Sequence, residues 1–196
     1  MEALLLWIQS EYNSSDELVA TLNVNGFINE YHFRKNQILF TPGGVNSEAW
    51  FLAQGLITVY TEDNRGQQVI SDFCPENNFF FDLESYYFGK PAEYYILALE
   101  DTHILSINHT AIRQLYDSDS HFRELCLIVK RQIVDRCHHR INLLAMSPIQ
   151  RFYAFCEIFP YNRITRHQIS QYLRIPYSSL NRIIHNSTII VSPALK

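Results

Sequence analysis

The sequence of 196 residues has no apolar run that approaches the roughly 18 to 20 residues needed to cross a bilayer. None of its four cysteines stands in the short paired spacing of a zinc or disulfide motif. The first residues, MEALLLWIQSEYNSSDE, have a short apolar part and no basic leading segment, so we expect no secretory signal. These absences, with 47% hydrophobic and 18% charged residues, favour a folded cytoplasmic protein with reduced, buried thiols.

Acidic residues are scarce in the last third of the chain. Residues 130–196 contain 10 Lys and Arg against 2 Asp and Glu, whereas residues 1–129 contain 6 against 18. The net charge of −4 therefore conceals a basic C-terminal segment. Such a segment is the footprint expected of phosphate contacts, and the acidic remainder would be held away from a DNA duplex.

Patterns typical of an enzyme are also lacking. No nucleophile–base pair, metal-ligand set or phosphate loop stands out, and Gly43-Gly44 alone predicts a turn. His103 and the pair His138-His139 lack the spacing of a metal or haem site, and we interpret them as exposed helix residues. We therefore expect neither an enzymatic activity nor a cofactor.

Residues 163–186 contain two short helical patterns joined by a turn. Their apolar residues recur at the i, i+3, i+4 spacing of a helix face: Ile169, Tyr172 and Leu173, then Leu180, Ile183 and Ile184. Ser170 is small enough for a helix crossing, and Pro176 suits the start of the second helix. The pattern is typical of a helix-turn-helix, with a helical hairpin packed on a core as the alternative. Arg174 at the turn argues against the first, since a positive φ there would cost on the order of 1 kcal/mol.

The second of these helices has a polar outer face without an acid, as an element that enters a DNA groove should have. Arg182 can contact a guanine edge or a phosphate, and Ser178 or Asn181 can contact bases. Basic residues near the first helix are candidates for phosphate contacts. The predicted DNA-binding residues are Arg163, Arg166, His167, Tyr177, Ser178, Ser179, Asn181, Arg182 and His185.

Short β-type runs punctuated by turns extend from Ile28 to about Ile107. Asp63-Asn64-Arg65-Gly66 is a strong hairpin turn. We predict strands over residues 37–40, 49–52, 56–60, 68–73, 94–99 and 103–107. Strands at roughly 8 to 12 residue spacing indicate a small barrel or sandwich.

Helical patterns lie on both sides of this β-region. Residues 1–21 predict an amphipathic helix, interrupted near residues 13–16, where a second helix could be capped. A long helix is predicted over residues 121–144, followed by one over residues 149–159 behind Ser147-Pro148. One stripe of the long helix keeps a spacing of four, and either the β-domain or the same helix of a second chain would cover it. Its residues, the predicted dimerisation set, are Leu125, Val129, Ile133, Cys137 and Ile141.

A family resemblance covers residues 27–186. The segments that carry it, besides the helix-turn-helix, are Pro42-Gly43, Phe51–Gly55, Asp82–Ser85, Gly89–Pro91, Ala98–Asp101 and Ser147–Phe152. In this order they resemble the CRP/FNR family of bacterial transcription regulators, most closely the shorter members found in Bacteroidetes-type bacteria. The resemblance implies an α+β fold. Its parts would be an N-terminal helix and β-roll sensor-like domain (1–110), a long dimerisation helix (111–146) and a helix-turn-helix domain (147–196). Thr188–Val191 resembles the last strand of a rudimentary wing in that domain.

The resemblance also implies a function. In such proteins the β-roll senses a signal, the long helix forms a homodimer, and each recognition helix enters a major groove of a near-palindromic site. Tyr177 and Ser178 stand where the family frequently has a base-reading Arg followed by Glu, whereas Arg182 keeps the later Arg, so the site that is read should differ. The implied partners are double-stranded DNA and a second copy of the chain. RNA polymerase and a small-molecule effector stay open as partners, and no membrane is implied. The alternative is a small-molecule or protein-binding module whose helix-turn-helix does not bind DNA.

The sensor part departs from the family members that bind cyclic AMP. Those members carry Gly-Glu and, further along, Arg-Ser or Arg-Thr, where this chain has Phe81-Asp82 and Ala92-Glu93. No Arg occurs from Gly66 to Ala111, and Glu93 would repel a phosphate, so we do not expect cyclic AMP binding. The cysteine cluster of iron–sulfur members is absent too. The aromatic residues of this stretch can line a pocket for an apolar effector or form a plain β-roll core. The candidate effector-pocket residues are Phe81, Asp82, Glu84 and Tyr94.

Overall fold

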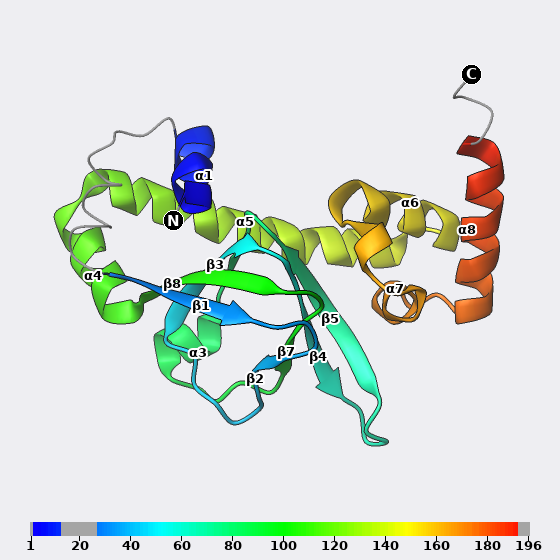
Figure 1. The fold of residues 1–196 in the computed structure, drawn as a ribbon, viewed down its shortest axis with the longest axis horizontal. Helices are drawn as coiled ribbons and strands as arrows, with labels where there is room; N and C mark the ends of the chain where they lie inside the picture. Colours follow the sequence, from blue (N-terminus) through cyan, green and yellow to red (C-terminus); the bar gives the residue numbers. More distant parts are fainter. Residues whose placement is uncertain (1, 13–26, 192–196) are drawn as a thin grey trace.

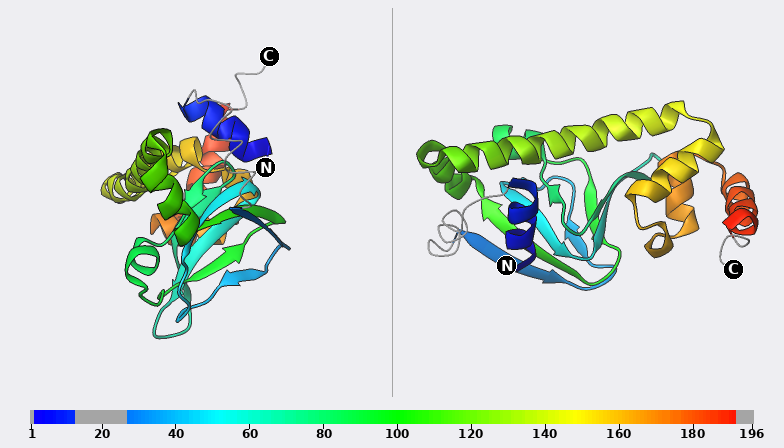
Figure 2. Two further views of the ribbon diagram at one scale, coloured as in Figure 1. Left: turned by 90° about the vertical axis from the view of Figure 1, so that its left-hand side faces the viewer. Right: turned by 90° about the horizontal axis from the view of Figure 1, so that it is seen from above.

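The computed structural model describes the backbone of residues 2–12 and 27–191, so the second N-terminal helix expected near residues 13–16 lies outside the described residues. A β-roll occupies one part of the molecule, a long helix runs along it, and a helical C-terminal part lies at one end (Figure 1 and Figure 2). Within the described ranges, none of the helices combines the length and the apolar character needed to cross a membrane.

The β-roll consists of two four-stranded antiparallel sheets, with the strand orders β1-β8-β3-β6 and β2-β7-β4-β5. The strands are β1 Ile28–Phe33, β2 Ile38–Phe40, β3 Glu48–Gln54, β4 Leu56–Glu62, β5 Gln68–Pro75, β6 Phe79–Phe80, β7 Tyr95–Ala98 and β8 Thr102–Asn108. The predicted α+β fold and the predicted strands are confirmed. Two strands were not predicted: β1, which lies in the predicted β-region but was not singled out, and β6, whose two residues leave no periodic signal.

The helices are α1 Glu2–Tyr12, α3 Leu83–Phe88, α4 His109–Ser118, α5 Ser120–Ala145, α6 Pro148–Ile158, α7 Arg166–Leu173 and α8 Tyr177–Val191. The helices predicted over residues 121–144 and 149–159 are confirmed as α5 and α6. The short α3 was missed, although Asp82 caps it by accepting hydrogen bonds from the backbone N–H groups of Glu84 and Ser85.

Gly55 turns the chain between β3 and β4 with a φ of +103°. A Cβ atom at this position would lie 2.6 Å from Thr102 Oγ1 and 2.8 Å from the backbone oxygen of Asp101. Only glycine therefore lets this turn lie against the turn between β7 and β8.

Two arginines fasten α5 to the β-roll. Arg136 donates a hydrogen bond to the backbone oxygen of Phe79 at 2.8 Å. Arg140, one turn further along the helix, donates to the backbone oxygens of Ser71 and, at 3.1 Å, Ile70. Because both guanidinium groups bond to main-chain atoms of the β-roll, they fix the position of the long helix on it.

The predicted helix-turn-helix is confirmed as α7, the segment Arg174–Pro176 and α8. Thr165 and Gln168 form a capping box at the start of α7, and Ser170 is buried in the angle between the helices. Arg174 ends α7 in the left-handed region, with φ 52° and ψ 43°, so the strain considered for this turn residue is present.

The predicted wing strand is wrong for the described backbone, because residues 188–191 continue α8. Their β-branched side chains suggested a strand, but this preference is weak against propagation of an existing helix.

The helix-turn-helix and the β-roll share one apolar core. Phe73 of β5 is fully buried, and its ring centroid lies 5.2 Å from that of Tyr172 in α7. It also lies 6.0 Å from the ring of Phe155 and 5.8 Å from that of Phe159, on the α6 side. The guanidinium of Arg140 covers the Tyr172 ring at 4.4 Å. We call Phe73, Phe155, Phe159 and Tyr172 the aromatic junction.

A cluster of one arginine and two carboxylates lies at the surface of this junction. Arg163 donates to both carboxylate oxygens of Glu76, at 2.6 and 2.8 Å, and also pairs with Glu100. Glu76 follows β5 and Glu100 precedes β8, whereas Arg163 precedes α7, so the cluster joins the β-roll to the helix-turn-helix. The hydrogen bonds from Arg163 lower the pKa of the Glu76 carboxyl.

Replacing Arg174 by glycine should stabilise the protein. Relief of the left-handed strain, offset in part by the greater backbone entropy of glycine in the unfolded chain, should raise the free energy of unfolding by about 0.5–1 kcal/mol. Urea denaturation measures the change. Arg174→Ala keeps the Cβ atom and should give no gain, so an equal gain from both variants would contradict the strain.

Glu76→Gln should lower the free energy of unfolding by about 0.5–1 kcal/mol at pH 7, since the pair with Arg163 is partly exposed. The folded-state pKa of Glu76 is depressed, so its stabilisation is complete above the ordinary value of 4.5 and is lost as pH falls through the folded value. The difference between the wild type and Glu76→Gln should therefore vanish in acid. Denaturation at several pH values checks this, with exposed Glu93→Gln as the control. A pH-independent difference would refute the role of the charge.

Candidate nucleic-acid interface

The outward face of α8 is polar and carries no acid. Leu180 and Ile183 are buried and anchor the helix, whereas Ser178, Arg182 and His185 are exposed on the opposite side. These three residues follow the i, i+4, i+7 spacing of a single helix face. In Figure 1, α8 stands at the end of the molecule, with α7 and α6 between it and the β-roll. This face is therefore open to a partner as large as a duplex.

Residues of α7 lie beside the start of this face. Arg166 donates a hydrogen bond to Asn181 Oδ1 at 3.1 Å, which joins the first turn of α7 to α8. The rings of His167 and Tyr177 lie 6.3 Å apart, and both side chains are exposed. Ser179 is half-buried on the flank of α8 that faces α6. Eight of the nine predicted DNA-binding residues thus lie on or beside one continuous surface.

Arg163 is the exception. Its guanidinium is held by Glu76 and Glu100 of the β-roll, so the prediction that it contacts a phosphate does not fit this structure. The chain order placed Arg163 near the helix-turn-helix, but the two acids lie 87 and 63 residues away in sequence. No local pattern could have revealed them.

Several of the basic residues in the C-terminal segment bond within the protein, so fewer of them can contact DNA than the count of Lys and Arg suggests. Arg136, Arg140 and Arg163 are engaged as described above. Arg151 donates to the backbone oxygens of Leu173 at 2.6 Å and Met146 at 2.9 Å, which ties the start of α6 to the end of α7. On the helix-turn-helix, the exposed cations are Arg166, Arg174 and Arg182. They are the arginines that a phosphate backbone can reach.

The predicted dimerisation stripe is wrong for its first half. Leu125 and Val129 are buried in the core between α5 and the β-roll, and Ile133 is partly buried there. Cys137 and Ile141 are exposed. The expectation of buried thiols holds in full only for Cys74, because Cys126 and Cys156 are partly buried and Cys137 is exposed. The reason is geometric. With 3.6 residues per turn, a spacing of four drifts about 40° around the helix at each step, so the stripe passes from the buried side to the exposed side.

A second line of apolar residues lies on the exposed side of α5. Leu127, Val134 and Ile141 have 59%, 47% and 66% of their surface exposed and follow one another at a spacing of seven. A seven-residue spacing drifts only about 20° per step, so the three side chains stay on one face. This line was not predicted as a seam, although its heptad spacing is visible in the sequence.

The loop that would hold a cyclic nucleotide does not fit one. Lys90, its one cation, forms an exposed ion pair with Glu84. Asp82 caps α3 and accepts a hydrogen bond from the hydroxyl of Tyr94 at 2.8 Å. Glu93 is exposed at the position where the resemblance requires a phosphate-binding group. The described loop thus offers no free cation to neutralise a cyclic phosphate.

The four candidate effector-pocket residues do not form one site. Phe81 lines a cavity beside α5, whereas Asp82 and Tyr94 bond to each other and Glu84 lies at the surface with Lys90.

Glu30, His32 and His103 are the described residues that come closest to a metal-ligand set. One ligand atom from each lies within 4.8 Å of the others. His103 is in β8, as the predicted strand over residues 103–107 has it, so grouping it with exposed helix residues was wrong. Its ring stacks on that of His32 with centroids 4.3 Å apart, and its Nε2 atom lies 3.3 Å from a Glu30 oxygen. Burial lowers the pKa of His103, so we interpret the group as a stacked imidazole pair with a carboxylate partner.

Comparison with known proteins was made at the level of sequence families and of solved structures. Residues 30–119 match the family model of the cyclic nucleotide-binding domain. No curated protein sequence matches the chain.

Solved structures match the fold at low sequence identity. FixK2 from Bradyrhizobium japonicum has a TM-score of 0.68 and 13% identity, covering 81% of this chain and 83% of its own. A cyclic nucleotide-binding domain-containing protein from Listeria monocytogenes has a TM-score of 0.70 and 14% identity, covering 87% and 88%. TTHA1359 from Thermus thermophilus, a transcriptional regulator of the CRP/FNR family, has a TM-score of 0.64 and 16% identity, covering 83% and 87%. Residues 30–119 therefore form a domain of the cyclic nucleotide-binding family, and the chain has the fold of CRP/FNR regulators.

Proposed function

We propose that the chain is a homodimeric, sequence-specific DNA-binding transcription regulator whose sensor domain does not use cyclic AMP. The observation that carries the proposal is the exposed face of Ser178, Arg182 and His185 on α8, which has hydrogen-bonding groups and no acid. An α-helix fits the major groove, and an arginine on it can make two hydrogen bonds to a guanine edge.

Each exposed arginine of the helix-turn-helix has a separate role in this proposal. Arg182 lies in the middle of the outward face and reads base edges. Arg166, in the first turn of α7, bonds to Asn181 and contacts a phosphate beside the groove. Arg174, between the helices, is a further phosphate contact. The fold shared with TTHA1359, a transcriptional regulator, supports this assignment.

The same proposal assigns dimerisation to the exposed line of α5. Leu127, Val134 and Ile141 would pack against the same residues of a second chain, as the seam of a coiled coil does. The division of the chain follows: a sensor-like part to about residue 110, then α4 and α5 to about residue 146, and the DNA-binding part after them. The single helix expected over residues 111–146 is divided at Asp119, and only α5 carries the dimer seam. Because the apolar seam and the buried face lie on different sides of α5, the helix can contact the β-roll and the partner at once.

The contacts of the nucleotide loop support a sensor that lacks cyclic AMP. Lys90 would have to leave Glu84 before it could bind a phosphate, and Glu93 would oppose the ligand.

A second candidate function is a small-molecule-binding module that keeps its helix-turn-helix for internal packing. The aromatic junction favours it, because Tyr172 of α7 is buried against Phe73 of the β-roll. One property distinguishes the two candidates. Only the DNA-binding regulator should bind duplex DNA with an affinity that falls steeply as the salt concentration rises.

Arg182→Ala should weaken binding to the preferred DNA site by about 1–3 kcal/mol and leave binding to random duplexes nearly unchanged, because it removes a base contact. Arg166→Ala should weaken binding to the preferred site and to random duplexes alike, because it removes a phosphate contact. The slope of log affinity against log salt concentration should fall by about one. Fluorescence anisotropy with labelled duplexes at several salt concentrations measures both effects.

Arg131→Ala is the matched control for loss of one positive charge. Arg131 is highly exposed on α5 and lies outside the helix-turn-helix. It should change neither affinity. Equal losses for Arg182→Ala on specific and random duplexes would remove the claim that Arg182 reads bases.

Val134→Glu should dissociate the dimer, raising its Kd more than about tenfold, because two carboxylates would be desolvated side by side in the seam. Sedimentation velocity across a concentration series measures the change. Val45→Glu replaces a valine of similar exposure away from α5 and should leave the dimer intact. A Val134→Glu protein that still dimerises would show that another surface holds the two chains together.

A further inference from the structure

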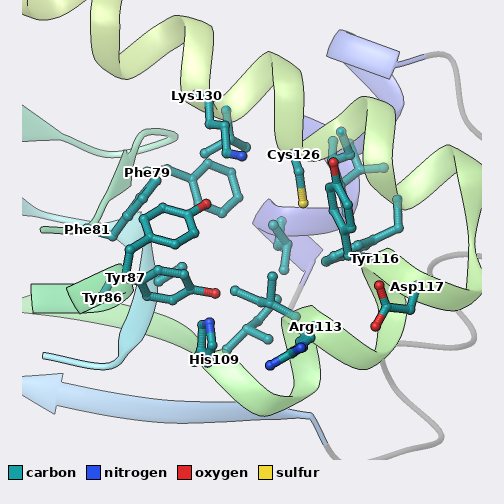
Figure 3. Close-up of a pocket in the computed structure, with 18 residues that line it drawn as sticks. Phe79, Phe81, Tyr86, Tyr87, His109, Arg113, Tyr116, Asp117, Cys126 and Lys130 are labelled. Carbon is teal, nitrogen blue, oxygen red and sulfur yellow. The ribbon is translucent and has the colours of Figure 1, made fainter. Parts of the chain in front are cut away.

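A cavity of about 410 Å³ lies between the first half of α5, the helices α1, α3 and α4, and the sheet that contains β3 (Figure 3). It falls within the usual range of small-molecule sites, roughly 300–1,000 Å³. Phe81, Tyr86 and Tyr87 of the stretch 81–93, where the family would hold a nucleotide, line this cavity, whereas Glu84, Lys90 and Glu93 of that stretch do not.

The wall of the cavity is mainly apolar. Both aromatic and aliphatic side chains form it, so the interior favours a hydrocarbon body over a sugar or a nucleotide. Leu4, Ile8, Ile112 and Phe122 belong to this apolar wall, together with the rings discussed below.

Tyr86 lines this cavity, and its buried hydroxyl has no hydrogen-bond partner among the residues that the structure describes. The side chain is almost completely buried, and burial raises the pKa of the phenol, so it remains an O–H donor. Leaving such a donor unpaired costs about 1–3 kcal/mol. An acceptor on a bound ligand would remove this cost.

Lys130 supplies a positive charge at the same cavity. Its ammonium lies 5.6 Å from the ring centre of Tyr87 and 6.0 Å from that of Tyr116. A hydrogen bond with Tyr87 is the main cause that raises the pKa of Lys130, so the group is charged at neutral pH. Figure 3 shows Lys130 on one side, Arg113 and His109 below, and Asp117 at the side away from Lys130.

We propose that this cavity binds a carboxylic acid with an apolar body, of the class of medium-chain fatty acids. The hydrocarbon lies among the aliphatic and aromatic side chains. The carboxylate pairs with Lys130 and accepts a hydrogen bond from the Tyr86 hydroxyl. Binding itself does not depend on the proposed DNA-binding function, whereas its role as the signal of the sensor domain does.

The location suits a signal. The lining comes from α1, α3 and α4 on one side and from Leu125, Cys126, Val129 and Lys130 of α5 on the other. A ligand would therefore stabilise the position of the β-roll against the helix that carries the proposed dimer seam.

The test titrates the full-length protein, without DNA, with decanoic acid in an isothermal titration calorimeter. Decanol and decylamine are the matched probes with a neutral and a positive head group. We expect one decanoate per chain, and decanol binding about tenfold or more weakly, since a charged hydrogen-bonded pair contributes more than a neutral one. Decylamine should bind more weakly still.

Three variants locate the ligand. Lys130→Met keeps the apolar stem and should weaken decanoate about tenfold while leaving decanol unchanged. Tyr86→Phe should weaken decanoate several-fold without loss of thermal stability, because it removes a buried hydroxyl that has no partner in the free protein. Lys90→Met removes the lysine of the nucleotide loop and should have no effect.

A cavity-filling change gives an independent control. Cys126→Phe places a larger side chain in the lining, and it should abolish binding of both decanoate and decanol while thermal unfolding stays cooperative. The proposal is overturned if decanoate does not bind, if decanol binds equally well, or if Lys90→Met rather than Lys130→Met weakens decanoate. Because DNA is absent from these titrations, their failure would leave the proposed DNA-binding function untouched.

Discussion

The burial of Phe73 among rings of the C-terminal helices is the interaction on which the arrangement depends. Phe73 belongs to β5, yet its neighbours Phe155, Phe159 and Tyr172 belong to the segment that ends in the helix-turn-helix. All four are almost completely buried. Burial of such rings contributes about 1.5–3 kcal/mol each, far more than a surface ion pair, so the junction sets where α7 lies and hence where α8 points.

Arginines around this junction divide into two groups. Arg136, Arg140, Arg151 and Arg163 bond to backbone or carboxylate oxygens of the protein and hold its parts together. The exposed Arg166, Arg174 and Arg182 are left on the helix-turn-helix. The basic character of the C-terminal segment thus serves two purposes. The arginines that bond within the protein keep the proposed DNA-binding face outward, and the exposed arginines give that face its positive charge.

The sequence predicted the features that depend on neighbours along the chain. The hairpin turn at Asp63–Gly66, the capped α6 and the helix-turn-helix all follow from local spacing. Arg174 was counted against the helix-turn-helix, yet the fold accepts its positive φ. Features that depend on distant partners were missed or wrong. Arg163 finds its acids across the molecule, and the four-residue stripe of α5 begins in the core at Leu125 and drifts to the exposed side by Ile141. The cavity beside Lys130 collects side chains from α1 to α5, which no single stretch of sequence could indicate.

The most direct measurement of the central claim is selection of binding sites by the purified protein from a pool of random DNA duplexes. The account predicts an enriched inverted repeat whose two half-sites lie one helical turn apart, about 34 to 36 Å between centres, because two copies of α8 read it together. A pool in which no sequence is enriched would contradict the account of a dimeric regulator that reads DNA through α8. Enrichment of a single half-site at every protein concentration would contradict it as well.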